Sequence, residues 1–417
     1  MSNFIETEIG LFPTHWSVSS VLNEAEVVTD YVANGSFASL KENVSYKSTV
    51  DYAILIRMVD FSRGFKGEFV YVDEKSYKFL KKSKLLGGEI IISNVGEYAG
   101  TVFRVPTLKS PMTLGPNSIM VKFKEGNDFY YYFFKSPAGQ DLIQSIRTGS
   151  AIPKFNKTDF RNLKIPVLPL QEKEGISEIL SSLDYKIDLL HQNNKTLEQL
   201  AETLFRQWFV EEVKEEWSEV KLGSYISLVS GYSYRSVDLN NSTKALVTLK
   251  NFERTGGFRH DGFKEYTGKY KDDQVVVSGD LIVAHTDITQ DAEVLGNPAI
   301  VISSSKYETL IISTDLVKVV PTSYLSKVYL YFLMKTDEFK HYCLGNSNGT
   351  TVLHLSKKAL PGFDLKLPPS LLVNKFTAIA EPLLEKKNNN QKLIQQLENL
   401  RDTLMPKLMS GLVRVEN

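Results

Sequence analysis

The residue types that most often carry out catalysis do not form recognised motifs in this chain. There is no HExxH motif, and the histidines show no spacing typical of a metal site. They are His15, His191, His260, His285, His341 and His354. The segment 345–349, GNSNG, formally matches the GxSxG motif of serine hydrolases, but its flanks are polar and no apolar strand precedes it. The segment 262–269 resembles a phosphate-binding loop, yet it has five residues between its glycines, and Tyr270 follows where a hydroxyl should bind magnesium. We therefore expect no catalytic residue and no metal site.

The composition of the chain indicates a folded protein with more than one domain. It has 417 residues, of which 42% are apolar and 11% aromatic, and this length exceeds one ordinary hydrophobic core. The single cysteine, Cys343, excludes an intrachain disulfide framework and is typical of a reducing compartment. The start of the chain is acidic rather than basic, and no apolar run approaches the roughly 20 residues of a membrane span. We expect a cytoplasmic protein.

The second half of the chain repeats the first at a period of about 200 residues. Five pairs of segments correspond in the same order: 15–17 with 216–218, 86–92 with 277–283, 129–134 with 328–333, 163–166 with 365–368, and 197–204 with 397–404. The last pair, LEQLAETL and LENLRDTL, is the most similar. These ordered correspondences predict a tandem duplication of a unit with a globular part and a helical tail.

The globular parts and the tails differ in their apolar pattern. The parts 1–168 and 216–370 contain short apolar runs separated by turns, which predicts two mixed α/β (α+β) domains. In the tails 169–215 and 371–417, apolar residues recur at alternating spacings of four and three, which is typical of a coiled coil. Asn194 and Asn390 occupy the same register, where a polar residue fixes the pairing.

We expect the two helical tails to pair as an antiparallel coiled coil. The residues expected at this helix and subunit interface are Leu183, Ile187, Leu190, Leu197 and Leu204 in the first tail, and Leu383, Leu393, Leu397, Leu400 and Leu404 in the second. The alternative is that each helix is amphipathic and packs only on its own domain.

The net charge of zero conceals an uneven distribution. Residues 31–170 hold 20 basic and 12 acidic side chains, whereas residues 171–220 hold 5 basic and 12 acidic ones. The basic block suits a nucleic-acid partner, because phosphate contacts require Lys and Arg. The acidic block is either a solvated helix face with a linker or a segment that avoids phosphates and contacts protein.

Tandem variable domains, each closed by a proline-rich turn and a long heptad helix, resemble the specificity subunit of type I restriction-modification enzymes. The stretch 149–173, GSAIPKFNKTDFRNLKIPVLPLQEK, is similar to the family's join between recognition domain and conserved helix. The stretch 197–209, LEQLAETLFRQWF, is similar to the end of that helix. The second join, LKLPPSLLVN at 365–374, departs from the pattern because it lacks the Gln-Glu-Lys that follows the first.

The resemblance implies a role in DNA recognition. Each globular domain would be a target recognition domain that reads one half of a bipartite double-stranded DNA sequence. The paired helices would separate the two domains and dock two methylase subunits, with restriction subunits joining them in phage defence. S-adenosylmethionine, ATP and magnesium would belong to those partners, so the chain itself would be non-catalytic and would hold no cofactor. The alternative from another class is a non-enzymatic scaffold whose two domains are joined by a coiled coil.

If the chain reads DNA, polar side chains on its loops should contact bases while Lys and Arg hold phosphates. In the first domain the candidates are Ser36, Ser39, Lys41, Arg63, Lys66, Ser93, Asn94, Arg147, Thr148 and Ser150. In the second domain they are Tyr232, Ser233, Tyr234, Arg235, Lys250, Arg254, Arg259, His285, Thr286, Asp287, Asn346, Asn348, Thr350 and Thr351. The alternative for each of them is an ordinary turn or a solvated surface residue.

Overall fold

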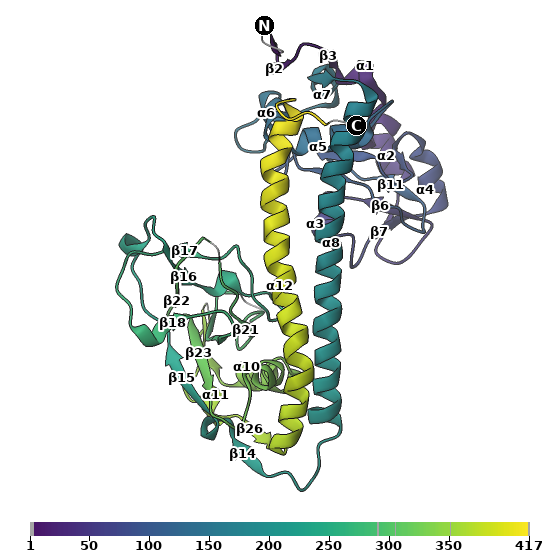
Figure 1. Cartoon of the computed structure of the whole chain (residues 1–417). Coiled ribbons are helices and arrows are strands. Elements are labelled where there is room, and N and C mark those ends of the chain that lie inside the picture. Colours follow the sequence, from purple (N-terminus) through teal and green to yellow (C-terminus); the bar gives the residue numbers. More distant parts are fainter. Residues whose placement is uncertain (1–3, 290–291, 305, 351, 416–417) are drawn as a thin grey trace. The chain divides into compact units, whose positions relative to one another are not determined.

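The computed structural model describes residues 4–289, 292–304, 306–350 and 352–415. The chain forms two compact units, of which unit 1 comprises residues 1–188 and 394–417 and unit 2 comprises residues 189–393 (Figure 1). Each unit contains part of the long helix α8 (Leu170–Arg206) and part of the long helix α12 (Ser370–Met409). Among the described residues, no helix is both long and apolar enough to span a membrane.

Unit 1 is built on two main β-sheets. The first is antiparallel with strand order β10-β9-β12-β4, and the second has the order β5-β7-β6-β11-β8, in which β6 and β11 are parallel. β9 carries three consecutive buried isoleucines, a β-branched run that favours a strand covered on both faces. The bounds are β4 Ala25–Asp30, β5 Tyr46–Lys47, β6 Ala53–Ile56, β7 Val70–Val72, β8 Lys84–Leu85, β9 Ile90–Ser93, β10 Val102–Arg104, β11 Met112–Leu114 and β12 Ser118–Phe123.

Smaller elements complete unit 1. A hairpin of β1 (Phe4–Thr7) and β2 (Gly10–Pro13) precedes β3 (Ser17–Ser20), which pairs with β13 (Lys164–Val167). The helices before α8 are α1 Val21–Glu24, α2 Phe37–Asn43, α3 Met58–Ser62, α4 Glu74–Phe79, α5 Asn127–Lys135, α6 Pro137–Ser145 and α7 Lys157–Asn162. The aromatic segment 129–134 forms α5, and its buried rings build the core together with β9 and β12.

Unit 2 repeats the topology of unit 1. Its sheet β15-β23-β19-β21 matches β4-β12-β9-β10, and its sheet β17-β16-β22-β18 matches β7-β6-β11-β8, including one parallel pair, β16 and β22. Two smaller sheets are β14-β26 and β20-β25-β24. The shared strand order confirms the duplication predicted from the sequence.

The elements of unit 2 before α12 have the following bounds. The strands are β14 Glu219–Lys221, β15 Ile226–Ser230, β16 Lys244–Val247, β17 Lys264–Glu265, β18 Val275–Val276, β19 Leu281–Ala284, β20 Thr286–Asp287, β21 Pro298–Ile300, β22 Thr309–Ile312, β23 Leu316–Pro321, β24 Ser347–Asn348, β25 Leu353–Leu355 and β26 Asp364–Lys366. The helices are α9 Lys327–Leu333, α10 Asp337–Gly345 and α11 Ala359–Gly362. A π-helical turn, Gln207–Glu211, follows α8.

Within each unit, the segments of α8 and α12 pack antiparallel. In unit 1, Arg401 Nη1 donates to Asp184 Oδ1 at 2.9 Å, and Leu180 shares a core with Met405. In unit 2, Asn390 Nδ2 donates to Asn194 Oδ1 at 2.8 Å. This bond satisfies the buried amide nitrogen of Asn390 and the buried side-chain oxygen of Asn194, as expected of polar residues that fix a helix register.

The seam of α8 follows the predicted positions, whereas the seam of α12 does not. Ile187 and Leu190 are buried, and Leu183, Leu197 and Leu204 are partly buried. On α12, however, Leu393 is 37% exposed and Leu400 is 46% exposed, while Ile394 and Met405 are buried. The prediction that Leu393 and Leu400 lie on the helix–helix seam is therefore wrong. Apolar residues occur side by side on α12, such as Leu393 with Ile394 and Leu404 with Met405, and packing buries the second of each pair more fully. Leu383, Leu397 and Leu404 are partly buried at its border.

Candidate nucleic-acid interface

In unit 1, the end of β9 and the chain after α6 form one polar edge. Asn94 follows β9 and exchanges two hydrogen bonds with Phe155: its Nδ2 donates to the carbonyl oxygen at 2.9 Å, and its own carbonyl accepts from the amide at 3.1 Å. Thr148 and Lys154 pair through backbone bonds of 2.8 and 2.9 Å. These bonds hold a hairpin against the end of the central strand. We call residues 93–98 and 147–155 the hairpin edge of unit 1.

Unit 2 builds the same edge with different side chains. β20 continues beyond β19 and pairs with β25, so that Thr286 lies opposite His354. β25 also pairs with β24, which places Asn348 opposite the same histidine. We call residues 285–289, 346–350 and 352–355 the hairpin edge of unit 2.

A glycine shapes the tip of each hairpin. Gly149 has a φ of +86°, and a Cβ there would lie 2.6 Å from the carbonyl oxygen of Ile152. Gly349 has a φ of +117°, and a Cβ would lie 2.0 Å from the carbonyl oxygen of Val352. Both values are below any normal contact distance, so each turn requires glycine for its conformation as well as for space. Glycine is therefore required at positions 149 and 349.

The electrostatics of the two edges differ. In unit 1, Arg147 and the exposed Lys154 contribute positive charge. In unit 2, burial lowers the pKa of His285, and the neighbouring His354 and Lys357 lower it further. His285 is therefore neutral at pH 7, while exposed Lys357 remains as a cation next to the edge.

The hairpin edges bring together several residues predicted to contact DNA. Asn94, Arg147, Thr148 and Ser150 lie on the edge of unit 1, and Asn348 and Thr350 on that of unit 2. Their contact with DNA stays a prediction. Thr351 lies outside the described residues.

Three predicted residues on these edges do not present their side chains to solvent. Ser93 is buried at the end of β9, and Thr286 is buried with its Oγ1 donating to Asp315 Oδ1 at 3.0 Å. Burial alone would raise the pKa of Asp287, but hydrogen bonds from Thr289, Val294 and Leu295 hold it below its usual range. Asp287 thus organises a loop. The predictions for Ser93, Thr286 and Asp287 are wrong in this conformation because tertiary hydrogen bonds and packing cover them.

The remaining candidates of unit 1 lie outside the hairpin edge. Ser36 caps α2, with its Oγ accepting from the amide of Ser39 at 3.2 Å, and Lys41 is exposed in the last turn of that helix. Arg63 and Lys66 are exposed in the turn after α3. Phe65 between them packs into a core beside Phe103, which fixes the turn.

The remaining candidates of unit 2 include several with structural partners. Tyr232 and Tyr234 pack on a small core of Leu246, Tyr266 and Ile311, whereas Ser233 and Arg235 beside them are exposed.

The basic candidates of unit 2 differ in their ion pairs. Arg254 pairs with Glu293 at 3.2 Å, and Arg259 pairs with Asp261. Within the described residues, Lys250 forms no ion pair, which leaves its exposed ammonium available.

The sequence reasoning overlooked residues that the hairpins carry. Lys154 and Ile152 are exposed in unit 1, and His354 is exposed in unit 2. The repeat held a signal for them, because each lies within six residues of the paired glycines Gly149 and Gly349.

No group of three or more His, Cys, Asp or Glu side chains that could hold a metal ion occurs within the part of the chain that the structure describes.

Known proteins resemble this chain over part or all of its length. Residues 46–199 match the model of the type I restriction modification DNA specificity domain. The MjaIX specificity subunit of Methanocaldococcus jannaschii is 24% identical, over 100% of this chain and 97% of the relative. The HindI specificity subunit of Haemophilus influenzae is 24% identical, over 65% of this chain and 73% of the relative.

One solved structure shows the fold. The type I restriction-modification S subunit from M. genitalium matches with a TM-score of 0.58 at 15% identity, covering 94% of this chain and 96% of that one. The mixed α/β fold with long helices is thereby confirmed. Residues 46–199 thus match a type I restriction modification DNA specificity domain, and the whole chain is similar to a type I restriction enzyme specificity subunit.

Proposed function

We propose that this chain is the DNA sequence-specificity subunit of a type I restriction-modification complex and that it recognises a bipartite target. Each unit reads one half of the target through its hairpin edge. The chain itself is non-catalytic. Its methylase partners carry S-adenosylmethionine and the adenine chemistry, and restriction subunits, where present, carry ATP and magnesium.

One observation carries this proposal: the same hairpin edge occurs twice on the same frame with different side chains. Thr148 and Lys154 pair with each other on one edge, where Asn348 and His354 pair on the other. Base recognition depends on the donors and acceptors presented to the groove. The two hairpin edges have similar strand pairing but present different side chains. They are therefore suited to two half-sites of different sequence.

The local charge supports DNA as the partner of unit 1, since residues 31–170 carry 20 basic and 12 acidic side chains. The whole chain, with 49 of each sign, has no net charge to attract phosphates. The isolated subunit should consequently bind DNA weakly, and the assembled complex should bind it more tightly at the same salt concentration.

Methylome sequencing tests the proposal. Cells that express the chain with the methylase genes of its operon should show methylated adenines in both halves of one split motif, and cells without the chain should not. If no split motif appears although both proteins are expressed and associated, the DNA-reading function is refuted, and a protein scaffold becomes the better description.

A matched pair of variants sharpens this test. Asn348→Ala removes an exposed amide from the hairpin edge of unit 2, and Asn241→Ala removes an exposed amide elsewhere in the same unit. We expect the first to relax or weaken recognition in one half of the motif only, by about 1–3 kcal/mol at one base pair. The second should leave both halves unchanged.

A further inference from the structure

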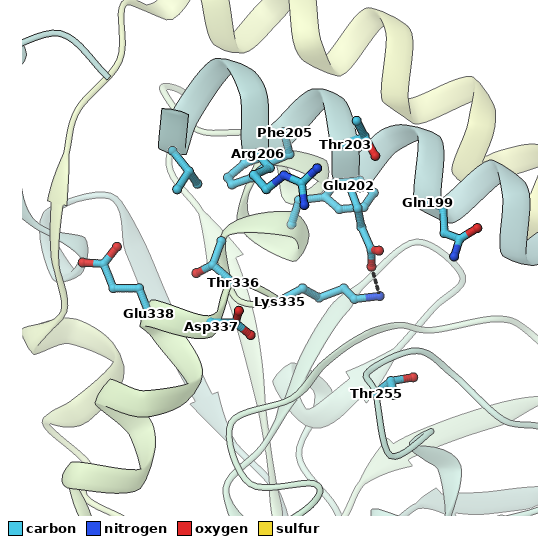
Figure 2. Close-up of a pocket in the computed structure, with 12 residues that line it drawn as sticks. Gln199, Glu202, Thr203, Phe205, Arg206, Thr255, Lys335, Thr336, Asp337 and Glu338 are labelled. Atoms are coloured by element: carbon cyan, nitrogen blue, oxygen red, sulfur yellow. Dashed lines mark ion pairs between the residues drawn. The ribbon is translucent and has the colours of Figure 1, made fainter. Parts of the chain in front are cut away.

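Unit 2 contains a groove that no DNA-reading residue lines. It has a volume of about 690 Å³ and lies between the C-terminal part of α8 and residues 332–338, which join α9 to α10 (Figure 2). Figure 2 shows Glu202 and Arg206 on the helical wall and Asp337 and Glu338 on the opposite wall. We call this the acidic groove.

The floor of the acidic groove is apolar. Phe205 of α8 and Phe332 of α9 lie beneath it, and both rings belong to the main core of unit 2. Val210, at the end of the helical wall, is 47% exposed. A second hollow of about 350 Å³ shares Phe205 and Val210 and continues past Val213. The apolar surface from Phe205 to Val213, which we call the apolar strip, thus continues from the groove into the second hollow.

The cations in the groove are already paired. Lys335 forms ion pairs with Glu198 at 2.6 Å and with Glu202 at 2.5 Å, and its side chain is nearly buried. Arg206 pairs with Glu211 at 3.1 Å. Lys335 is therefore neutralised by these two carboxylates, and the charge of the exposed Arg206 is offset by Glu211.

The walls carry unneutralised negative charge. Asp337 and Glu338 are exposed in the first turn of α10, and within the described residues neither has a cation at ion-pair distance. They stabilise the helix N-terminus, but their charges still face the groove. Beside it, the segment 211–219 holds five exposed glutamates and one exposed lysine; Glu211 pairs with Arg206 and Glu219 with Lys366, and the other three glutamates form no ion pair within the described residues. Phosphates are repelled from such a surface, whereas ammonium and guanidinium groups are attracted.

We propose, resting on the function proposed above, that the acidic groove docks a basic amphipathic segment of the methylase partner. Its apolar side chains lie on the strip from Phe205 to Val213, and its Lys and Arg side chains face Asp337, Glu338 and the 211–219 glutamates. Charge complementarity selects this occupant over DNA, and an open, elongated groove with an apolar floor fits a polypeptide segment.

A single-cysteine photocrosslinker tests the occupant. The native Cys343 is fully buried, and burial raises the pKa of its thiol to about 12, so it does not compete for a maleimide reagent. Val210→Cys places a label in the groove, and Val50→Cys, at an exposed position in unit 1, is the control. Both chains are labelled with benzophenone maleimide, assembled with the methylase subunit and irradiated, and methylation activity is measured in the same preparation.

We expect a crosslink from position 210, but not from position 50, to a Lys- and Arg-rich methylase peptide. An active complex without that crosslink overturns the inference and leaves the specificity function intact. Crosslinks to DNA, to a second copy of this chain or to an acidic peptide overturn it as well. If the unlabelled chain does not associate with the methylase at all, the proposed function fails too.

Charge neutralisation provides a second readout. Asp337→Asn with Glu338→Gln removes the wall charges, and Asp272→Asn with Asp273→Asn is a matched pair of exposed acids in the first turn of another short helix. We expect the groove variant to bind the methylase about 5-fold more weakly at low salt, with the difference vanishing at high salt. The control should bind as the parent does, and equal affinity of all three chains would overturn the inference.

Discussion

A buried ion cluster in unit 2 links α8, α12 and the end of α9. Glu198 of α8 accepts hydrogen bonds from Lys387 of α12 at 2.5 Å, from Lys335 at 2.6 Å and from the hydroxyl of Tyr331 at 2.6 Å. The Glu198 side chain is 14% exposed and that of Lys387 is 9% exposed. Burial alone would raise the pKa of Glu198, but the two ammonium groups lower it from 4.5 to about 2.

The substitution Glu198→Gln should destabilise unit 2 severely. The lowering of the Glu198 pKa from 4.5 to about 2 corresponds to about 3 kcal/mol. Lys335 keeps Glu202 as a partner, but Lys387 would be left buried without its carboxylate. Breaking a buried pair by removing one partner costs about 3–5 kcal/mol. We expect a loss in this range. In Glu198→Leu with Lys387→Met, much of the loss should be recovered, because apolar groups then replace both charges.

Urea unfolding followed by tryptophan fluorescence measures this effect. Trp208 and Trp217 lie in unit 2, so a Trp16→Phe background removes the signal of unit 1. Glu219→Gln is the control, because its partner Lys366 is 3.8 Å away and both side chains are exposed; we expect a change below about 1 kcal/mol.

The pH dependence gives an independent check. Because the folded pKa of Glu198 lies below its unfolded value of 4.5, its stabilisation is fully present above about pH 5 and is lost as the pH falls towards 2. The difference between parent and Glu198→Gln should therefore be constant from pH 8 to 5 and shrink below it. A loss under about 1 kcal/mol at pH 7, or a difference that does not change down to pH 3, would refute the reasoning.

Three further predictions concern the proposed DNA interface. Lys154→Ala should reduce the log–log salt dependence of DNA binding by the assembled complex by about 0.9, as measured by fluorescence anisotropy; an unchanged slope would argue against a phosphate contact. Gly349→Ala should strain the hairpin of unit 2 by about 1–3 kcal/mol and speed amide hydrogen exchange there, because its Cβ meets the carbonyl oxygen of Val352. Gly345→Ala has open space around its Cβ and serves as the control. Inserting seven residues into both α8 and α12 keeps the heptad register and adds about 10 Å of rise. The unread spacer of the methylated motif should then lengthen by about three base pairs at about 3.4 Å each. An unchanged spacer in an assembled complex would show that the helices do not set the spacer length.

Periodic and repeated features were predictable from the sequence because they are local. The isoleucine run of β9 and the heptad spacing of α8 each fix the type of element within about ten to forty residues. The duplication was predictable for the same reason, since paired segments occur in the same order in both halves. These signals predicted the mixed α/β fold and the two long helices.

The accessibility of polar side chains could not be predicted in this way. Ser93, Thr286 and Asp287 have the residue types of a DNA interface, yet packing and hydrogen bonds from distant residues cover them. Lys154, by contrast, was not among the predicted DNA contacts, yet its side chain is exposed on the hairpin.

By itself, then, the sequence determined the duplication, the class of fold and the acidic character of residues 211–219. Only the tertiary structure decided which of the neighbouring apolar residues on α12, such as Leu393 and Ile394, is buried, because that choice depends on the facing helix. The tertiary structure also determined which residues form the hairpin edges and which line the acidic groove. Both are assembled from segments far apart in the chain, and no local pattern specifies which distant side chains will share a surface.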